Sequence, residues 1–266
     1  MKNHFFVSYV GNKRNEIDKF YNKINFDDID TIIEPFCGSC AMSFYISQKQ
    51  PNKFKYIFND LDDFIYKLLS FMKDSRDDEI KAFEDKINNY IDSLNSFSDD
   101  LLRKEMYNKI IKNGTFEGIF FGKKYFKIKA GLYPILSGVK KINKYSVKCP
   151  MFDFLRSENV VLSNNNGLEI YKENAIYSNC LMLIDPPYMM ACNDFYISGN
   201  RLNIYEYCAN NDISQNKAKT YFILENIWII KLLFGKYYLD EYEKKYNMKQ
   251  QKKTSHVLIY SGAKNE

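Results

Sequence analysis

The segment at residues 31–41 constrains the fold of this chain more than any other. Thr31-Ile32-Ile33 is a short β-branched run typical of a strand, and a helical pattern follows the turn Glu34-Pro35-Phe36-Cys37-Gly38-Ser39-Cys40-Ala41. A strand, a turn of small residues and a helix in this order are typical of nucleotide-type cofactor sites in doubly wound α/β proteins. Gly38 lets the backbone approach a ligand closely, because glycine has no side chain. The segment therefore predicts an α/β fold with a ligand at the end of its first strand.

The next predicted strand also ends in acidic residues. Tyr56-Ile57-Phe58 is followed by Asn59-Asp60-Leu61-Asp62. In doubly wound nucleotide sites, an acid at the end of the second strand is placed to bind ribose hydroxyls. We therefore predict that Asp60 binds a ribose, with Asp62 as the nearest alternative.

A third apolar run, Leu181 to Ile184, predicts a buried strand that ends in Asp185-Pro186-Pro187-Tyr188. Asp185 and the Pro186 carbonyl can accept both hydrogens of an exocyclic amine on a planar base, and Tyr188 offers a face for stacking. Proline has a fixed φ and no N–H, which keeps the loop rigid. The alternative is an ordinary turn with a solvated aspartate.

Taken together with Tyr9-Val10-Gly11-Asn12-Lys13-Arg14, these motifs resemble the Dam-type, α-class DNA adenine methyltransferases, including members from viruses and restriction-modification systems. The resemblance runs along nearly the whole chain. It implies S-adenosylmethionine as the cofactor and a Rossmann-like methyltransferase core. It assigns catalysis to Asp185, Pro186, Pro187 and Tyr188. It assigns cofactor binding to Tyr9, Gly11, Asn12, Lys13, Glu34, Pro35, Phe36, Gly38, Asp60 and Asp185.

The sequence departs from the family pattern in two places. Cys40 stands where the cofactor loop normally has a second glycine; because cysteine is small, we expect the change to be tolerated, and its effect on cofactor affinity is left open. The stretch Glu117-Gly118-Ile119-Phe120-Phe121 lacks the asparagine and arginine that Dam-type recognition segments usually carry. The recognised DNA sequence is therefore not predicted.

The spacing of the motifs predicts an insertion. Glu34 and Asp185 lie about 150 residues apart, whereas the first and fourth strands of a doubly wound sheet need about 60–80 intervening residues. We predict a core of residues 1–66 and 151–266 with a largely helical target-recognition insert, residues 67–150. Within the insert we expect helices at 81–94 and 101–112, a break at Gly114 and Gly118, and hairpin elements at 125–136. In the core we expect strands at 160–162, 220–224 and 256–260, a buried helix at 227–234 and a loop at 189–216.

Charge is distributed unevenly over the insert. Residues 74–100 hold nine acids against three cations, a balance of −6, whereas residues 101–148 hold twelve cations against two acids, a balance of +10. A basic block interleaved with aromatic residues suits a phosphate backbone with bases close by. The alternative is a solvated basic face over an aromatic core. The residues predicted to bind nucleic acid are Lys123, Lys124, Lys127, Lys129 and Tyr133.

Composition narrows the class of protein. A chain of 266 residues, 45% of them hydrophobic, suffices for one substantial core and a smaller insert. We expect neither a membrane span, because no run of 18 apolar residues occurs, nor a signal peptide. Six cysteines in a chain of this size favour a reduced, intracellular protein. The resemblance implies that it is cytoplasmic and bacterial or viral. Cys37 and Cys40 leave zinc or redox chemistry open, but the expectation is that no metal is bound.

The motifs favour adenine as the methylated base. Cytosine 5-methylation needs a cysteine nucleophile, typically in a Pro-Cys pair, which this chain lacks. In enzymes for the cytosine 4-amino group the tetrapeptide usually begins with serine, and in glutamine methyltransferases with asparagine. Double-stranded DNA is the expected partner, possession of a cognate restriction endonuclease is left open, and a monomer or weak dimer is expected. Two alternatives remain: an RNA adenine methyltransferase, and a non-enzymatic nucleic-acid binder with a degenerate cofactor pocket.

Overall fold

A computed structural model of the chain describes residues 13, 16–125, 142–188, 203–245 and 253–262. Its contacts divide the chain into two compact units, one with residues 70–157 and the other with residues 12–69 and 158–266. The first division falls within helix α3 (Asp63–Asp74) and the second just beyond helix α7 (Pro150–Leu155). The predicted boundaries, 66/67 and 150/151, fall inside the same two helices.

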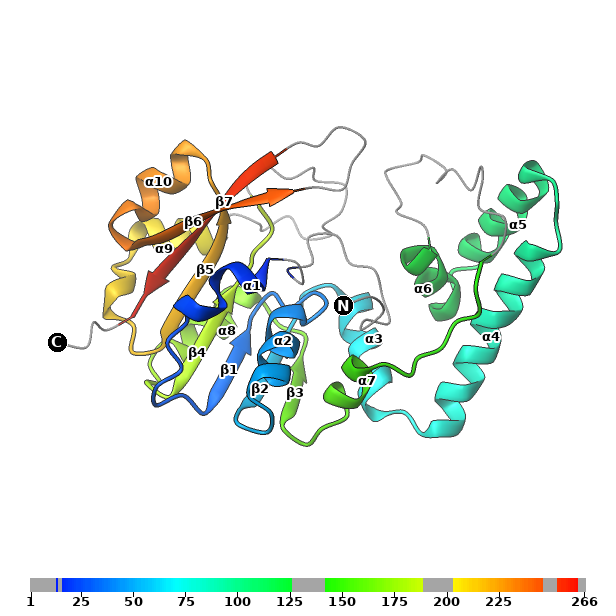
Figure 1. The fold of residues 1–266 in the computed structure, drawn as a ribbon, viewed down its shortest axis with the longest axis horizontal. Coiled ribbons are helices and arrows are strands. Elements are labelled where there is room, and N and C mark those ends of the chain that lie inside the picture. The colour runs from blue at the N-terminus through cyan, green and yellow to red at the C-terminus, as the bar shows by residue number, and fades with distance from the viewer. Residues whose placement is uncertain (1–12, 14–15, 126–141, 189–202, 246–252, 263–266) are drawn as a thin grey trace. The chain divides into compact units, whose positions relative to one another are not determined.

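The larger unit is built on one seven-stranded sheet with the order β3-β2-β1-β4-β5-β7-β6 (Figure 1). The first five strands in this order run parallel, and β7 is antiparallel to both β5 and β6. This arrangement confirms the predicted doubly wound, mostly parallel sheet. In chain order the strands are β1 (Thr31–Glu34), β2 (Lys55–Asn59), β3 (Val160–Ser163), β4 (Cys180–Ile184), β5 (Lys219–Glu225), β6 (Tyr238–Lys245) and β7 (Lys253–Ser261).

The sheet has helices packed on it, which explains the near-continuous apolar sequence of its central strands. All five residues of β4 are buried. One hydrophobic cluster joins β4 and β5 to α8 (Gly167–Asn174), α9 (Asn203–Asn210) and α10 (Trp228–Phe234). The unit also contains α1 (Ile17–Phe20), α2 (Ala41–Lys49) and the short 3₁₀ turns Tyr21–Lys23, Ile213–Gln215 and Gly235–Tyr237.

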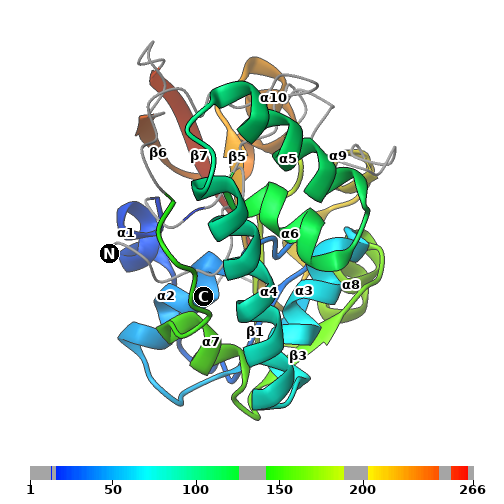
Figure 2. The same ribbon diagram turned by 90° about the vertical axis from the view of Figure 1, so that its right-hand side faces the viewer.

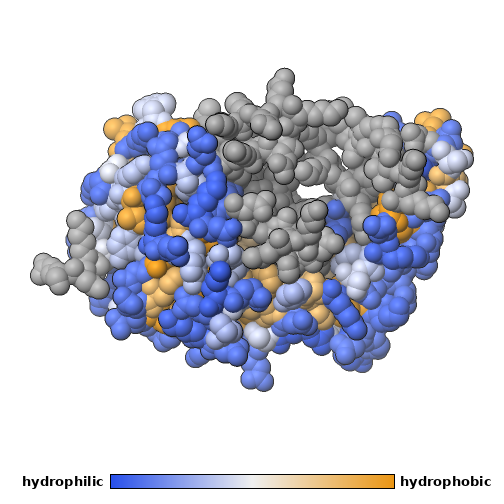
Figure 3. All heavy atoms as spheres, viewed as in Figure 1, coloured by the Kyte–Doolittle hydropathy of each residue, from blue (hydrophilic) through white to orange (hydrophobic). Residues whose placement is uncertain are grey.

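Two sequence predictions for this unit were wrong. The helix predicted as buried is α10, but Trp228 is 75% exposed and only Ile230 and Phe234 are buried. Leu232 is also exposed, and apolar atoms lie at the upper left of Figure 3, where Figure 1 places α10. Part of the segment predicted as a loop at 189–216 forms α9; residues 189–202 lie outside the described residues.

The smaller unit is helical, as predicted for the insert (Figure 2). Its helices include α4 (Asp77–Asn95), α5 (Asp100–Lys112), α6 (Phe116–Tyr125) and α7. Aromatic rings from α4, α6 and the segment after them pack together in its core, among them Phe83, Phe120 and Tyr145. The predicted break at Gly118 was wrong, because this residue lies within α6. A Cβ there would be 2.6 Å from the Ile110 carbonyl oxygen, so glycine allows α6 to approach α5 closely.

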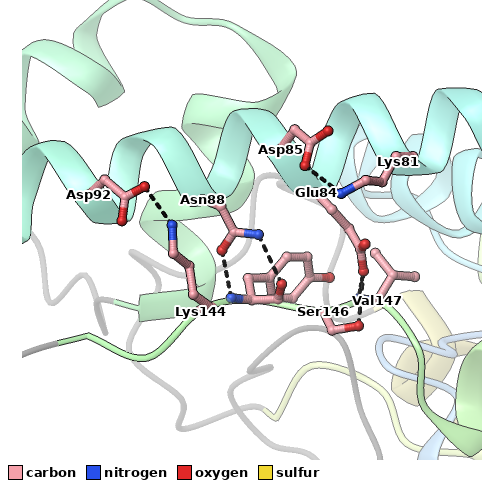
Figure 4. A network of polar contacts seen from close by, with 9 residues as sticks. Lys81, Glu84, Asp85, Asn88, Asp92, Lys144, Ser146 and Val147 are labelled. Carbon is pink, nitrogen blue, oxygen red and sulfur yellow. Dashed lines mark hydrogen bonds and ion pairs between the residues drawn. The ribbon is translucent and has the colours of Figure 1, made fainter.

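One face of α4 binds the extended segment at residues 142–147 (Figure 4). Asn88 donates to the Tyr145 carbonyl at 3.1 Å and accepts from the Tyr145 N–H at 2.8 Å. Asn95, two turns further on, makes the same pair of bonds with Ile142, both at 2.9 Å. Each of these amides bonds both the N–H and the carbonyl of one residue, as a neighbouring strand would. They attach residues 142–147, at the end of the basic block, to α4. The predicted hairpin elements at 125–136 were wrong at Tyr125, which ends α6, and residues 126–136 lie outside the described residues.

No helix in the described parts of the chain is long and apolar enough to span a membrane.

Candidate active site

Three predicted functional segments meet at one edge of the sheet. β2, β1 and β4 are neighbours and run parallel, so their carboxyl ends lie side by side. Glu34 is the last residue of β1, Asp60 follows β2, and Asp185 follows β4. In open α/β sheets this edge is where ligands bind.

The cofactor loop is fixed by buried polar contacts. Glu34, the acid of the motif, accepts a hydrogen bond from the Ser43 N–H at 2.8 Å, which ties β1 to the first turn of α2. Burial raises the pKa of Glu34 to about 7, and its bonds with Ser43 oppose that rise. Asn59 donates to the carbonyls of Pro35 and Asn165, both at 2.9 Å. Sequence reasoning missed Asn59, because its amide bonds become apparent only once the neighbouring loops are in place.

Two residues of the loop have left-handed backbone conformations, Gly38 with φ +49° and Cys40 with φ +53°. Glycine adopts this region at little cost, and other residues only with strain. The second positive φ gives a physical reason for the family's usual glycine at the position of Cys40. Phe36 packs against the hydrophobic cluster beneath the loop, and Gly167 at the start of α8 lies against both Pro35 and Phe36.

The two loop cysteines are buried, and burial raises the pKa of both the Cys37 and Cys40 thiols. A thiol in that state is a poor nucleophile and metal ligand at neutral pH. Within the described ranges, no group of three or more His, Cys, Asp or Glu side chains could hold a metal ion.

Asp60 and Asp62 have different local roles. Asp60 accepts from the Gly38 N–H at 2.8 Å and from the Asp62 N–H at 2.9 Å, so its carboxylate joins the cofactor loop to the end of β2. Asp62 accepts from the N–H groups of Phe64 and Ile65 at the start of α3. The first carboxylate therefore lies against the predicted ribose site, and the second caps a helix.

This difference predicts separate effects for the two acids. Asp60→Asn should weaken cofactor affinity first, because it removes the charge beside Gly38. Asp62→Ala should instead lower the free energy of unfolding by about 1 kcal/mol, the usual cost of a lost N-cap, with cofactor affinity nearly unchanged. Calorimetric titration with S-adenosylmethionine and thermal unfolding of both variants would check this. If Asp60→Asn binds normally and Asp62→Ala does not, the ribose role belongs to Asp62.

The predicted catalytic tetrapeptide, residues 185–188, contains one partner of an ion pair. Lys13 Nζ lies 2.6 Å from Asp185 Oδ2, and the Lys13 side chain is only 3% exposed. The same ammonium lies 5.0 Å from the centroid of the Tyr188 ring, within range of a cation–π contact. Pro186 is buried, and the Tyr205 hydroxyl donates to the Pro187 carbonyl at 3.4 Å. Lys13 thus touches both the acid and the aromatic ring of the predicted catalytic loop.

The remaining predicted site residues are only partly described. Tyr9, Gly11 and Asn12 lie outside the described residues, as do Lys127, Lys129, Tyr133 and the side chain of Lys123. Lys124 is on α6, with Nζ 5.5 Å from the centroid of the Tyr145 ring. Burial lowers the pKa of Lys124 to about 8. The assignment of these lysines to phosphate binding stays a prediction.

The chain is similar to known methyltransferases. Residues 9–126 match the family model described as D12 class N6 adenine-specific DNA methyltransferase. The chain is 26% identical over 274 residues to the Type II methyltransferase M.CviBI of Paramecium bursaria Chlorella virus NC1A, and the alignment covers 91% of each.

Solved structures similar to the chain include two methyltransferase domains, each 9% identical to it. The delta-N METTL16 MTase domain has a TM-score of 0.42, with 96% of this chain and 84% of that one covered. The human methyltransferase 10 domain containing protein has a TM-score of 0.39, with 97% and 84% covered.

Proposed function

We propose that this chain is a D12-class N6 adenine-specific DNA methyltransferase, that it methylates a specific, flipped-out adenine with S-adenosylmethionine, and that Asp185 receives the 6-amino group. The observation that carries this assignment is the ion pair between Asp185 and the buried Lys13, at the edge where the cofactor loop also lies. An ion pair with a buried lysine positions the carboxylate, and positioning contributes much of the acceleration in such a transfer.

The residues at the end of β1 suit the cofactor. The two left-handed residues, Gly38 and Cys40, turn the loop backbone sharply above the sheet, and Asp60 offers carboxylate oxygens for ribose hydroxyls. When bound, S-adenosylmethionine would supply an electrophilic methyl group on a sulfonium. Glu34 would act indirectly, by fixing the start of α2 through Ser43.

Asp185 and the Pro186 carbonyl would accept the two hydrogens of the 6-amino group. The amine is a poor nucleophile because its lone pair is delocalised into the ring, and these hydrogen bonds favour a localised pair. Asp185 is also placed to take up the proton that the nitrogen loses, although stabilising the positive charge alone would suffice.

The adenine must leave the duplex to reach this edge, at a cost of a few kcal/mol. Stacking on the Tyr188 ring would recover about 1–3 kcal/mol of that cost.

The test of the proposed function is to sequence the DNA of a host that expresses the protein and to map its methylated adenines. Methylated adenine at one sequence motif is expected with the wild type and not with Asp185→Ala. Methylation of RNA alone would support an RNA adenine methyltransferase. Cofactor binding without any methyl transfer would support a non-enzymatic nucleic-acid binder.

The basic block of the insert is the proposed DNA-binding surface. Changing its lysines to glutamine should weaken binding to all DNA sequences and flatten the salt dependence, by about 0.9 in the logarithmic slope for each duplex phosphate that is no longer neutralised. Cofactor affinity should not change. The four lysines are Lys123, Lys124, Lys127 and Lys129.

A matched control removes the same charge from exposed lysines of the other unit: Lys53, Lys67, Lys217 and Lys236. DNA affinity is measured at several salt concentrations for the wild type and both variants. An equal change in slope for the two variants would mean that binding depends on net charge alone and that the block is an ordinary solvated face.

We also propose that the protein is cytoplasmic and monomeric or weakly dimeric. Because the viral relative is named a type II methyltransferase, a cognate restriction endonuclease is a further partner to test for. Cleavage of unmethylated DNA by extracts of the source organism, blocked by prior treatment with this protein, would support such a partner.

A further inference from the structure

We propose that His256 and Glu16 are positioning residues that orient Tyr188, the stacking residue of the catalytic loop. The inference rests on the proposed function, because it concerns how Tyr188 meets the adenine. It assigns roles to two residues that no sequence motif singled out. Neither acts on the substrate; both act through the tyrosine.

Three side chains are joined through one atom, His256 Nδ1. His256 Nδ1 lies 2.9 Å from Glu16 Oε2 and 3.4 Å from the Tyr188 hydroxyl. The Tyr188 and His256 rings meet edge to face, with centroids 5.2 Å apart and planes at 88°. The Nδ1 atom therefore lies between the carboxylate and the phenol. A proton on it would be donated mainly to Glu16, at the shorter distance.

The register of the sheet brings His256 to the active edge. On β7 it pairs with Glu225, the last residue of β5, and β5 is the parallel neighbour of β4. On its other side His256 pairs with Tyr242 of β6, whose hydroxyl donates to Glu16 Oε2 at 3.2 Å. Glu16 is thus oriented by residues from two strands, in a position that the antiparallel end of the sheet creates.

Glu16 also belongs to the turn that carries Lys13. The Glu16 N–H donates to the Lys13 carbonyl at 2.9 Å. Lys13 contacts Asp185 and the Tyr188 ring, and Glu16 contacts the histidine beside the Tyr188 hydroxyl. Through Lys13 this turn contacts Asp185 and the Tyr188 ring. Through Glu16 it contacts His256, which packs against Tyr188.

Burial argues that this arrangement serves more than packing. His256 is 1% exposed and Glu16 is 2% exposed. A buried histidine–glutamate pair is costly to desolvate, and apolar residues of similar volume are often at least as stabilising. The polar pair has a further consequence: the bond from Nδ1 to Glu16 fixes the direction of the His256 ring, against which Tyr188 packs edge to face with its hydroxyl 3.4 Å from Nδ1.

The test is a double-mutant cycle with Tyr188→Phe, which retains the ring and removes the hydroxyl. His256→Leu should lower the single-turnover rate of methyl transfer by tenfold to about a hundredfold, the usual range for a misplaced reacting group. S-adenosylmethionine affinity should stay within about twofold. In a protein that already carries Tyr188→Phe, adding His256→Leu should lower the single-turnover rate little further, because the effect of His256 depends on the Tyr188 hydroxyl.

A spectroscopic readout separates positioning from general stability. DNA with 2-aminopurine at the target position should show an altered fluorescence change on binding His256→Leu, because the flipped base no longer stacks normally. His256→Asn, which keeps an N–H donor near the place of Nδ1, should restore part of both the rate and the signal. Glu16→Gln provides a second route to the same effect if His256→Leu does not fold.

Additive losses in the cycle, or wild-type rate and fluorescence in a folded His256→Leu or Glu16→Gln variant, would overturn the inference. The wild-type reaction in the same assay tests the proposed function on its own. If wild-type protein does not methylate adenine, the function fails, whereas a normal wild-type rate with unaffected variants rejects only the positioning role.

Discussion

Asp185→Ala is expected to lower the rate of methyl transfer by about 10³-fold or more, in line with the contribution of a positioned acid or base. The variant removes the acceptor for the amine hydrogens and the group placed to take the proton. Cofactor binding should be largely intact although Asp185 is also among the predicted cofactor-binding residues, because the ribose contact is assigned to Asp60 at the end of a different strand. A rate within about tenfold of wild type, a loss under 1.4 kcal/mol, would contradict the assigned role.

The ion pair with Lys13 makes the choice of control important. Alanine at position 185 leaves the Lys13 ammonium buried beside an apolar group, and breaking a buried pair typically costs about 3–5 kcal/mol of stability. The double variant Lys13→Met, Asp185→Ala removes that penalty. It should regain stability in thermal unfolding and remain inactive. Recovery of activity in the double variant would mean that misfolding, and not the missing carboxylate, explained the loss in Asp185→Ala.

Gly167→Ala is expected to damage the cofactor loop from a position outside every recognised motif. A Cβ at Gly167 would lie 2.6 Å from Cε1 of the Phe36 ring and 2.8 Å from the Pro35 carbonyl oxygen. The ring can turn only within a packed core, and the carbonyl belongs to the backbone. We expect a loss of about 1–3 kcal/mol in the free energy of unfolding and at least a tenfold weaker affinity for S-adenosylmethionine.

Gly235→Ala is the matched control for that change. Gly235 has no heavy atom within 4 Å of the place where a Cβ would lie, so alanine meets open space there. Its affinity and stability should match those of the wild type. If Gly167→Ala also behaves as wild type, the contact between α8 and the cofactor loop is loose enough to move, and the loop geometry does not depend on glycine there.

The sequence by itself determined the type of fold and the edge of the sheet at which the predicted site residues lie. Thr31 to Ile33 is β-branched and Leu181 to Ile184 is apolar, as is typical of strands in a buried sheet, and each run is followed by a motif with an acid. In a parallel sheet, the carboxyl ends of neighbouring strands meet at one edge. The order of the motifs is therefore enough to place Glu34, Asp60 and Asp185 together. The surplus length between the first and last of them also predicts the helical insert.

Only the tertiary structure decided which residues surround those motifs. Glu16 and His256 lie near opposite ends of the chain, and the antiparallel pairing of β7 with β5 brings the histidine to the active edge. Glycine has a low helix propensity, which predicts a break at Gly118. Gly118 nevertheless lies inside α6, because close packing against α5 outweighs that propensity. Local sequence reports the preferences of a segment for strand, helix or turn. Contacts between segments distant in sequence depend on strand register and packing. The free energy gained from these contacts depends on the tertiary arrangement, which a local stretch of sequence does not specify.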